Sequence, residues 1–427
     1  MTDASKAGSE LHKTLTVTKG VGVALSMIIG SGLLVLPGLA YATVGPSAIY
    51  AWLIAALVVL PLLLIFAHLG ARYPTAGGVQ GFAQAAFGAT GSAVTSMILL
   101  GACAFGGAAM AVTGGNYVVA VFDRPGLAGW AAGGYLVLIC LLQSAGSRLA
   151  GGVQTVVAMV LLVLLALVAF VPVFASGAQL HGEIAPPSHW AESLPAIGLI
   201  FFAYNGWELV SSTAEEYRNP RRDFPLVIGI TFVVVVAVYV GIAVAVQATL
   251  SQGDPQLAHA PLVAVLSQVV GGASGQVAAV LGALIIFATL MGGTWATSRI
   301  VFATARERLL PPVLARVHDG SGAPRPAIVV SGLMFGAVVV AYSLGALSLA
   351  LVFRLAAVNF VVGYGIAVAS YAKLTAKPGQ RLLAVLAGVP VLALLAGFGW
   401  LLLYPAALVA WAGGRDVIRR RRLARAT

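Results

Sequence analysis

Charged residues are scarce in this chain, and acidic residues are scarcer than basic ones. Only 9% of the 427 residues are charged, and 13 are Asp or Glu against 24 Lys or Arg, whereas soluble domains carry about 25% charged residues. Apolar residues make up 60% of the chain, and the mean hydropathy is +0.99. This composition excludes a soluble globular protein and indicates an integral membrane protein.

Groups that build metal centres, disulfide frameworks or enzyme active sites are also few. The two cysteines, Cys103 and Cys140, lie in apolar runs, where cysteine usually serves as a small core residue. None of the six histidines lies in the middle of an apolar run, and no pair of titratable side chains there could fill general acid and base roles. We therefore expect no metal, no cofactor and no enzymatic activity.

The apolar runs are long enough to span a bilayer about twelve times. A spanning helix needs about 20 apolar residues and satisfies its own backbone hydrogen bonds in lipid, so we predict an all-α polytopic membrane protein. The longest connections have about twenty residues, which leaves no room for a soluble domain. The predicted helices lie near residues 20–42, 47–68, 90–121, 127–143, 151–175, 195–215, 224–249, 274–303, 327–343, 348–371, 381–397 and 398–413.

The basic residues predict how these helices are oriented. When the N-terminus is cytoplasmic, 21 of the 24 Lys and Arg fall on the cytoplasmic side, Arg124 falls outside, and Arg299 and Arg354 lie within spans. This pattern follows the positive-inside rule and predicts cytoplasmic tails at residues 1–19 and 414–427. The net charge of +11 then suits contact with anionic lipid and not with nucleic acid. Arg299 is expected to extend to the cytoplasmic interface.

Two apolar segments, about half a chain apart, are interrupted by residues that unwind helices. The first breaks at Gly30-Ser31-Gly32 and the second at Tyr204-Asn205-Gly206. Unwound backbone at mid-membrane depth is tolerated where it is buried or lines a cavity, and paired breaks in two halves mark a transporter's substrate site. For a single Gly-Ser-Gly the alternative is close helix packing, which uses the same small residues.

The two breaks offer complementary chemistry. A helix that restarts after Gly30-Ser31-Gly32 presents N–H groups, a hydroxyl and partial positive charge, which suit a carboxylate. Carbonyls freed near Phe202, Ala203 and Asn205 suit an ammonium group. A carboxylate site beside an ammonium site describes the α-carbon end of an amino acid, which we predict as the substrate.

Glu208 is the acidic residue that the sequence places deepest in a predicted span. It lies thirteen residues, or about 20 Å, past the start of its helix, where an acidic residue costs about 2.5 to 3.5 kcal/mol even on insertion scales. One interpretation is a protonated or hydrogen-bonded carboxyl that only pins two helices together. The other is a carboxyl that exchanges a proton or gates the site.

The side-chain end of the pocket is predicted to be apolar. No charged residue is available there to pair with a charged substrate side chain, which favours a neutral, fairly large apolar amino acid. Each aromatic residue by itself is more often a packing residue than a ligand contact. The candidate lining residues are Phe105, Met110, Phe201, Phe202, Tyr204 and Trp207.

Four motifs in order resemble those of the amino acid, polyamine and organocation transporter superfamily. Ile28-Ile29-Gly30-Ser31-Gly32 with Leu36-Pro37-Gly38 is similar to the first-helix signature, and Tyr73-Pro74-Thr75-Ala76-Gly77-Gly78 with Ala86-Phe87-Gly88 is similar to the motif after helix 2. Tyr204-Asn205-Gly206-Trp207-Glu208 with residues 214–225 resembles the sixth-helix motif, and residues 298–311 resemble the end of helix 8. Length and motif details look most like the branch of methionine and branched-chain amino acid exporters.

The resemblance implies a LeuT-type fold with discontinuous helices 1 and 6. Residues 20–175 and 195–371 would form two inverted repeats of five helices, and residues 381–413 would form two peripheral helices. By matching positions, the first break would hold the substrate carboxylate, the second would offer carbonyls, and Phe202 would cover the substrate. The candidate substrate-binding residues are Ile28, Gly30, Ser31, Gly32, Phe202, Ala203 and Asn205, and the candidate gating and proton-coupling residues are Phe202, Tyr204 and Glu208.

The chain departs from many proton-coupled relatives on helix 5. Those relatives place a lysine a few residues after a Val-Gln pair, where it substitutes for a sodium ion. Here Val153-Gln154 is followed by an apolar stretch around Leu161, which excludes proton coupling through that lysine.

We therefore predict a secondary active transporter of neutral L-amino acids, with proton-coupled efflux of methionine and branched-chain amino acids across a bacterial cytoplasmic membrane by alternating access. The alternatives are an uptake permease or exchanger, including cationic amino acid or polyamine antiport, and an amino acid sensor that does not transport. The resemblance alone favours export over uptake. The expected partners are the amino acid, protons and membrane lipid, and the composition is compatible with an oligomer.

Overall fold

The computed structural model describes residues 11–30, 32–122, 127–175, 196–197, 200–259 and 261–424. In these ranges the regular structure is helical, and extended backbone pairs only in an isolated bridge between Leu15 and Tyr217. Nine helices of the described part are long and apolar enough to cross a membrane. The predicted all-α polytopic architecture is confirmed.

Up to Ala175, the described residues of the chain form six α-helices. The predicted span 90–121 begins eleven residues earlier, at Val79, because a left-handed Gly88 (φ 71°) joins a preceding helix to it across a kink. The six are α1 (Val17–Ile28), α2 (Gly32–Val44), α3 (Ala48–Arg72), α4 (Val79–Val121), α5 (Ala128–Ala145) and α6 (Ser147–Ala175).

From Phe202 onward, the structure differs from the prediction in one connection and at the C-terminal end. The stretch expected as a connection near 250–273 holds two short helices, and the segment expected as a tail from residue 414 continues the last helix. The elements are η3 (Phe202–Tyr204), α8 (Trp207–Ser211), η4 (Ala214–Glu216), α9 (Pro220–Thr249), α10 (Gln256–His259), α11 (Pro261–Val270), η5 (Gly271–Ala273), α12 (Ser274–Arg306), η6 (Pro312–Ala315), α13 (Arg325–Ser343), α14 (Leu349–Leu374), α15 (Pro378–Ala396), η7 (Gly399–Leu402) and α16 (Leu403–Ala424).

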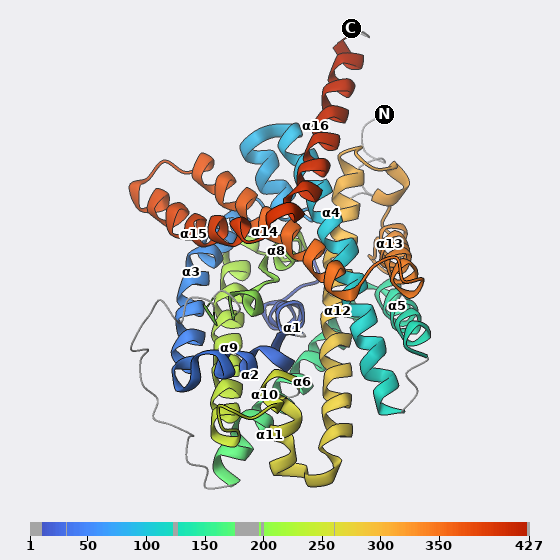
Figure 1. Cartoon of the computed structure of the whole chain (residues 1–427). Coiled ribbons are helices and arrows are strands. Elements are labelled where there is room, and N and C mark those ends of the chain that lie inside the picture. Colours follow the sequence, from blue (N-terminus) through green and yellow to red (C-terminus); the bar gives the residue numbers. More distant parts are fainter. Residues whose placement is uncertain are drawn as a thin grey trace.

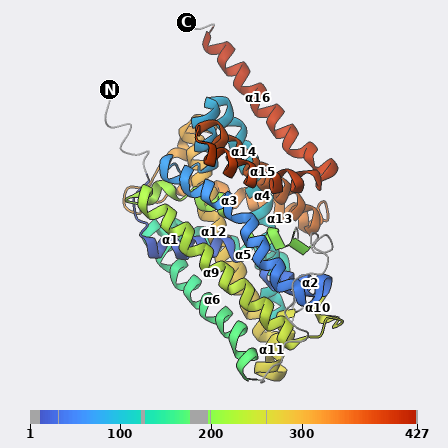
Figure 2. The same ribbon diagram turned by 90° about the vertical axis from the view of Figure 1, so that its left-hand side faces the viewer.

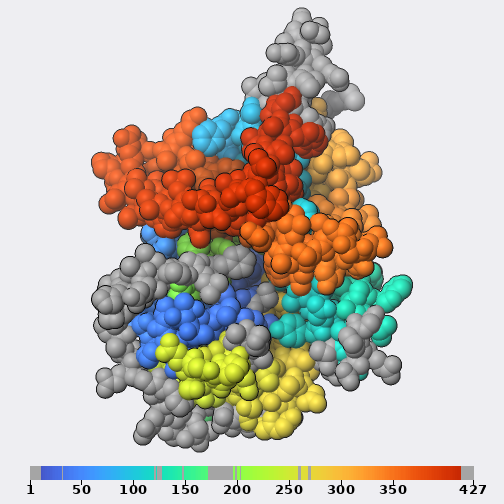
Figure 3. All heavy atoms as spheres, viewed as in Figure 1, coloured from blue at the N-terminus to red at the C-terminus, as the bar shows by residue number. Residues whose placement is uncertain are grey.

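The interrupted segments lie at the centre of the bundle. Helix α1 packs against α6, α9 and α12, while the long helix α4 packs against α12 and α14 (Figure 1). Helices α15 and α16 lie on the outside, and α16 projects beyond the bundle when the molecule is turned by 90° (Figure 2). In the space-filling view, α2 and α10 form part of the surface in the half of the bundle that lies away from α16 (Figure 3).

Candidate functional site

The two interruptions face each other inside the bundle. Helix α1 ends at Ile28, and α2 begins at Gly32. The second segment passes from η3 through a left-handed Gly206 (φ 116°) into α8. A Cβ atom on Gly206 would lie 2.8 Å from the carbonyl oxygen of Met27, so only glycine allows the two backbones to approach this closely.

A cavity of about 140 Å³ opens between these segments and α4, α12 and α14. A buried apolar cavity of similar volume, about 150 Å³, holds benzene, so this one suits the side chain of a small ligand. Among the described residues, its lining contains one acidic residue, Glu208, and no Lys, Arg or His. The larger apolar lining side chains are Met27, Ile28, Met110, Leu209, Leu290, Phe335, Phe353 and Phe360.

The structure brings most of the predicted site residues to this cavity. Six of them line it, from both breaks: Ile28, Gly30, Gly32, Ala203, Asn205 and Glu208. Ser31 lies outside the described residues, and Phe202 is described only through its backbone. Tyr204 does not line the cavity, because its buried ring packs edge-on against Trp52 at a centroid distance of 6.1 Å.

The aromatic lining comes largely from other helices than expected. Of the candidates outside the second break, Met110 lines the cavity, whereas Phe105 packs against Tyr404. Phe201 and Trp207 are buried but are not part of the lining. The apolar floor is formed instead by Phe335 of α13 and two phenylalanines of α14, which no sequence pattern singled out.

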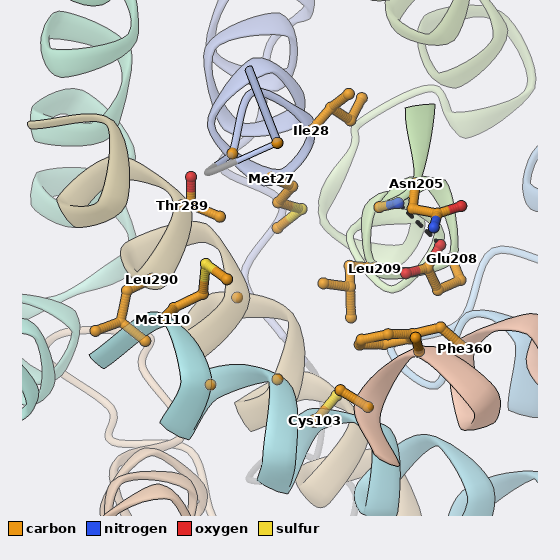
Figure 4. Close-up of a pocket in the computed structure, with 18 of the residues that line it drawn as sticks. Met27, Ile28, Cys103, Met110, Asn205, Glu208, Leu209, Thr289, Leu290 and Phe360 are labelled. Carbon is orange, nitrogen blue, oxygen red and sulfur yellow. Dashed lines mark hydrogen bonds between the residues drawn. The ribbon is translucent and has the colours of Figure 1, made fainter. Parts of the chain in front are cut away.

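Asn205 and Glu208 provide the polar end of the cavity (Figure 4). The buried Glu208 carboxylate accepts a hydrogen bond from the N–H of Gly206 at 3.1 Å, and the Tyr364 hydroxyl lies at the same distance from that N–H. The Asn205 Oδ1 atom is buried and has no hydrogen-bond partner among the described residues. A buried acceptor without a partner costs about 1–3 kcal/mol, so this atom is available to a donor on a bound ligand.

Tyr239 of α9 connects both breaks and was missed by sequence reasoning. Its hydroxyl lies 3.1 Å from the carbonyl oxygen of Ile28 and 3.0 Å from that of Ala203. Thr289 of α12 similarly donates to the Ile29 carbonyl at 2.8 Å. Both hydroxyls satisfy carbonyls that have left their helices, and isolated hydroxyls in apolar helices were the available signal.

Replacing Tyr239 by phenylalanine should weaken substrate binding by about tenfold. The change removes the hydroxyl from two buried carbonyls, and a lost buried hydrogen bond of this kind costs about 1–3 kcal/mol. The measurement is the apparent KM for methionine exchange in proteoliposomes. Tyr135→Phe is the matched control, since it also breaks a bond between helices, to the Ala283 carbonyl at 3.1 Å. An equal KM in both variants would contradict a role for Tyr239 at the site.

Helix α6, which has no lysine after Val153-Gln154, is tied to α1 by neutral groups. Gln154 donates a hydrogen bond from its amide nitrogen to the hydroxyl of Ser26, and both side chains are buried. A Cβ atom on Gly292 of α12 would lie 2.9 Å from each of these two polar atoms. Helices α1 and α6 are therefore joined by a neutral hydrogen bond, and α12 packs closely against it through Gly292.

Arg299 does not extend to the interface, which corrects the expectation from the sequence. It is 1% exposed, and its guanidinium bonds both carboxylate oxygens of Glu216 at 2.7 and 3.2 Å. The indole N–H of Trp295 donates to the same carboxylate at 2.8 Å, and Arg306 pairs with Glu215 in the same way nearby. Glu216 is thus a second buried acid. Its bonds to Arg299 and Trp295 join α12 to η4, the segment that follows α8.

Arg299→Met should lower the free energy of unfolding by about 3–5 kcal/mol, because it leaves the fully buried Glu216 carboxylate without its cation. Arg306→Gln is the control and should cost at most about 1 kcal/mol, since its ion pair with Glu215 is partly exposed. Thermal unfolding of the purified variants measures both effects. The double change Arg299→Met with Glu216→Gln should recover most of the loss, and an unchanged melting temperature for Arg299→Met would refute a stabilising role for the buried pair.

Comparison with known proteins identifies the family. The family model described as amino acid permease, within the amino acid, polyamine and organocation superfamily, matches residues 15–416. The chain belongs to the amino acid permeases. Membership makes it a transporter and not an enzyme, and its spans make it a multi-pass membrane protein.

Several characterised and uncharacterised permeases are similar over much of their length. The uncharacterised amino acid permease YecA of Bacillus subtilis is 28% identical over 94% of this chain and 95% of its own. The L-methionine/branched-chain amino acid exporter YjeH of Escherichia coli is 29% identical over 95% of this chain and 96% of its own. The human large neutral amino acids transporter small subunit 2 is 27% identical over 75% of this chain and 63% of its own.

A solved structure confirms the fold. The crystal structure of MhsT in complex with L-phenylalanine superposes with a TM-score of 0.65 at 14% identity, and covers 91% of this chain and 99% of MhsT. The permease therefore has the predicted LeuT-type fold.

Proposed function

We propose that this permease exports methionine and branched-chain amino acids from a bacterial cell in exchange for protons, by alternating access across the cytoplasmic membrane. The E. coli relative named for this activity supports the substrate class and the direction. The distribution of Lys and Arg along the chain supports a cytoplasmic location for the end of the bundle from which α16 projects.

The observation that carries the proposal is one cavity lined by both breaks, with Asn205 and Glu208 at one end and mostly apolar side chains elsewhere. The N-terminus of α2 reaches the cavity through Gly32, where the partial positive charge of the helix suits a substrate carboxylate. Asn205 Oδ1 is a free acceptor for the substrate ammonium. The remaining lining suits an apolar side chain, because a charged one would meet no compensating group.

Glu208 is the proton carrier in this proposal. It is 2% exposed, and among described residues it is the acidic group that reaches the cavity. A carboxyl held only by neutral hydrogen bonds in a buried site can accept a proton at low cost, because desolvation disfavours its charged form. Substrate ammonium near the carboxyl favours proton release, so the two cations would occupy the site in turn.

Alternating access requires contacts on either side of the cavity to open and close in turn. The buried pair of Arg299 with Glu216 and the pairing of Leu15 with Glu216, through a backbone bond of 3.1 Å, hold α1, α12 and the segment after α8 together. In this proposal, these contacts close the route between the cavity and the end of the bundle from which α16 projects. Opening on that side would separate them.

The substrate class is tested by counterflow. Proteoliposomes loaded with unlabelled methionine should accumulate labelled methionine, and external leucine, isoleucine and valine should compete for this uptake. Arginine, lysine, glutamate and putrescine should not compete, because the lining lacks a partner for their charged groups. Strong competition by arginine or putrescine would instead support cationic amino acid or polyamine exchange.

A further inference from the structure

A second pocket lies between the C-terminal end of α3 and the start of α9. These two helix ends lie toward the end of the bundle from which α16 projects (Figure 1). It is open to the surface and has a volume of about 570 Å³. It shares no lining residue with the central cavity. Its lining residues are Ala67, His68, Ala71, Arg72, Arg221 and Pro225.

Every charged residue in this lining is basic, and none is neutralised by the described part of the chain. Arg72 and Arg221 are exposed and form no ion pair there, although the Arg72 guanidinium rests 5.8 Å from the ring centroid of Tyr73. His68 packs edge-on against Tyr371, yet its Nε2 atom is buried without a hydrogen-bond partner among described residues. Two guanidinium groups and an unpartnered imidazole nitrogen form a site for an anion with several oxygens.

Apolar side chains continue from the pocket toward the middle of the membrane. On α3, Leu64 lies one helical turn before His68 and is 49% exposed, and Leu57 is 65% exposed. On α9, Leu226 follows Pro225 directly and is 44% exposed, and Val233 is 66% exposed. In a membrane-spanning helix such exposed apolar residues face acyl chains. The basic pocket therefore lies at one end of a lipid-facing strip formed by Leu57, Leu64, Leu226 and Val233.

We propose that this pocket binds the phosphate of an anionic phospholipid, with its acyl chains lying along the exposed residues of α3 and α9. A free phosphate would use the basic groups alone, whereas a lipid also uses the apolar strip below them. Pockets of this kind, basic and between helices at the cytoplasmic surface, suit anionic headgroups. The site thus gives the α3–α9 pair, which borders the central segments, a defined lipid partner.

The test measures phospholipid retention by native mass spectrometry on the full chain purified in detergent. The protein is titrated with phosphatidylglycerol or with phosphatidylcholine of the same acyl chains. Arg72→Gln with Arg221→Gln removes both guanidinium groups from the pocket. Arg308→Gln with Arg316→Gln is the matched control, since it removes two arginines that do not line the pocket.

Each arginine near an anionic headgroup contributes about a fivefold factor in affinity. The pocket variant should therefore bind phosphatidylglycerol about twenty-fivefold more weakly than the wild type and the control, which should agree. If the double variant does not elute as a folded protein, Arg221→Gln alone should weaken binding about fivefold. The proposal would be overturned if the pocket variant bound phosphatidylglycerol as tightly as the wild type does. It would also be overturned if the wild type bound phosphatidylcholine as tightly as phosphatidylglycerol. Displacement of phosphatidylglycerol by millimolar inorganic phosphate would also overturn it, by assigning the pocket to a free anion.

Discussion

A Glu208→Gln permease should still exchange methionine, at a rate within about threefold of the wild type, but its flux should no longer respond to a pH gradient. Glutamine preserves the size of the side chain and can still accept the hydrogen bond from the Gly206 N–H. It cannot take up or release a proton. In the wild type, an imposed gradient of two pH units should accelerate methionine flux by at least about tenfold, since such a gradient corresponds to about 2.7 kcal/mol per proton.

The control for this prediction is Asp254→Asn, which removes an acid from the connection after α9, where the Asp254 side chain accepts a bond from the Gln256 N–H. That variant should keep the full response to the gradient. Labelled methionine flux in proteoliposomes, with sodium varied independently, measures both variants. A Glu208→Gln protein that retains the full response would remove this carboxyl from the coupling mechanism.

Gly206→Ala should reduce methionine flux by at least about thirtyfold and lower the melting temperature. Alanine at a positive φ costs about 1–2 kcal/mol, and here φ is 116°. The new Cβ would also lie 2.8 Å from the Met27 carbonyl oxygen, which is backbone and cannot rotate away. The two breaks would have to separate, so both the cavity and the hydrogen bonds across it would change.

The matched control is Gly152→Ala on α6, where an added Cβ has no atom within 4 Å and the backbone is helical. This substitution should leave flux and melting temperature unchanged, or raise the latter slightly through the better helix propensity of alanine. Flux near the wild-type level in Gly206→Ala would show that close approach of the two breaks is not needed for transport.

The fold class followed from the sequence because bilayer spans leave a strong local signal. Apolar runs were enough to place most of the long helices, and the positions of Gly30, Gly32 and Gly206 drew attention to both interruptions. Helix ends were harder to predict from the sequence. The residues from Val79 to Phe87 are helical but less apolar than a span, and the last helix continues into a basic segment that composition assigns to a tail.

The site was predictable where its chemistry is local and was missed where it depends on distant contacts. Asn205 and Glu208 stand out as polar residues beside a break, and both line the cavity. Tyr239 acts on carbonyls 36 and 211 residues away, and Arg299 pairs with a glutamate 83 residues away. Helix α14 is apolar on several faces, so its sequence alone does not reveal that Phe360 points into the cavity.

The most direct test of proton antiport is the pH change that methionine causes inside proteoliposomes loaded with a pH-sensitive dye, starting without any gradient. Methionine added outside would enter down its gradient, and each molecule would drive a proton out, so the lumen should become alkaline. Glu208→Gln vesicles should show no change. Acidification of the lumen would indicate symport, and a constant pH during methionine entry would indicate uncoupled transport; either result would contradict proton antiport through Glu208.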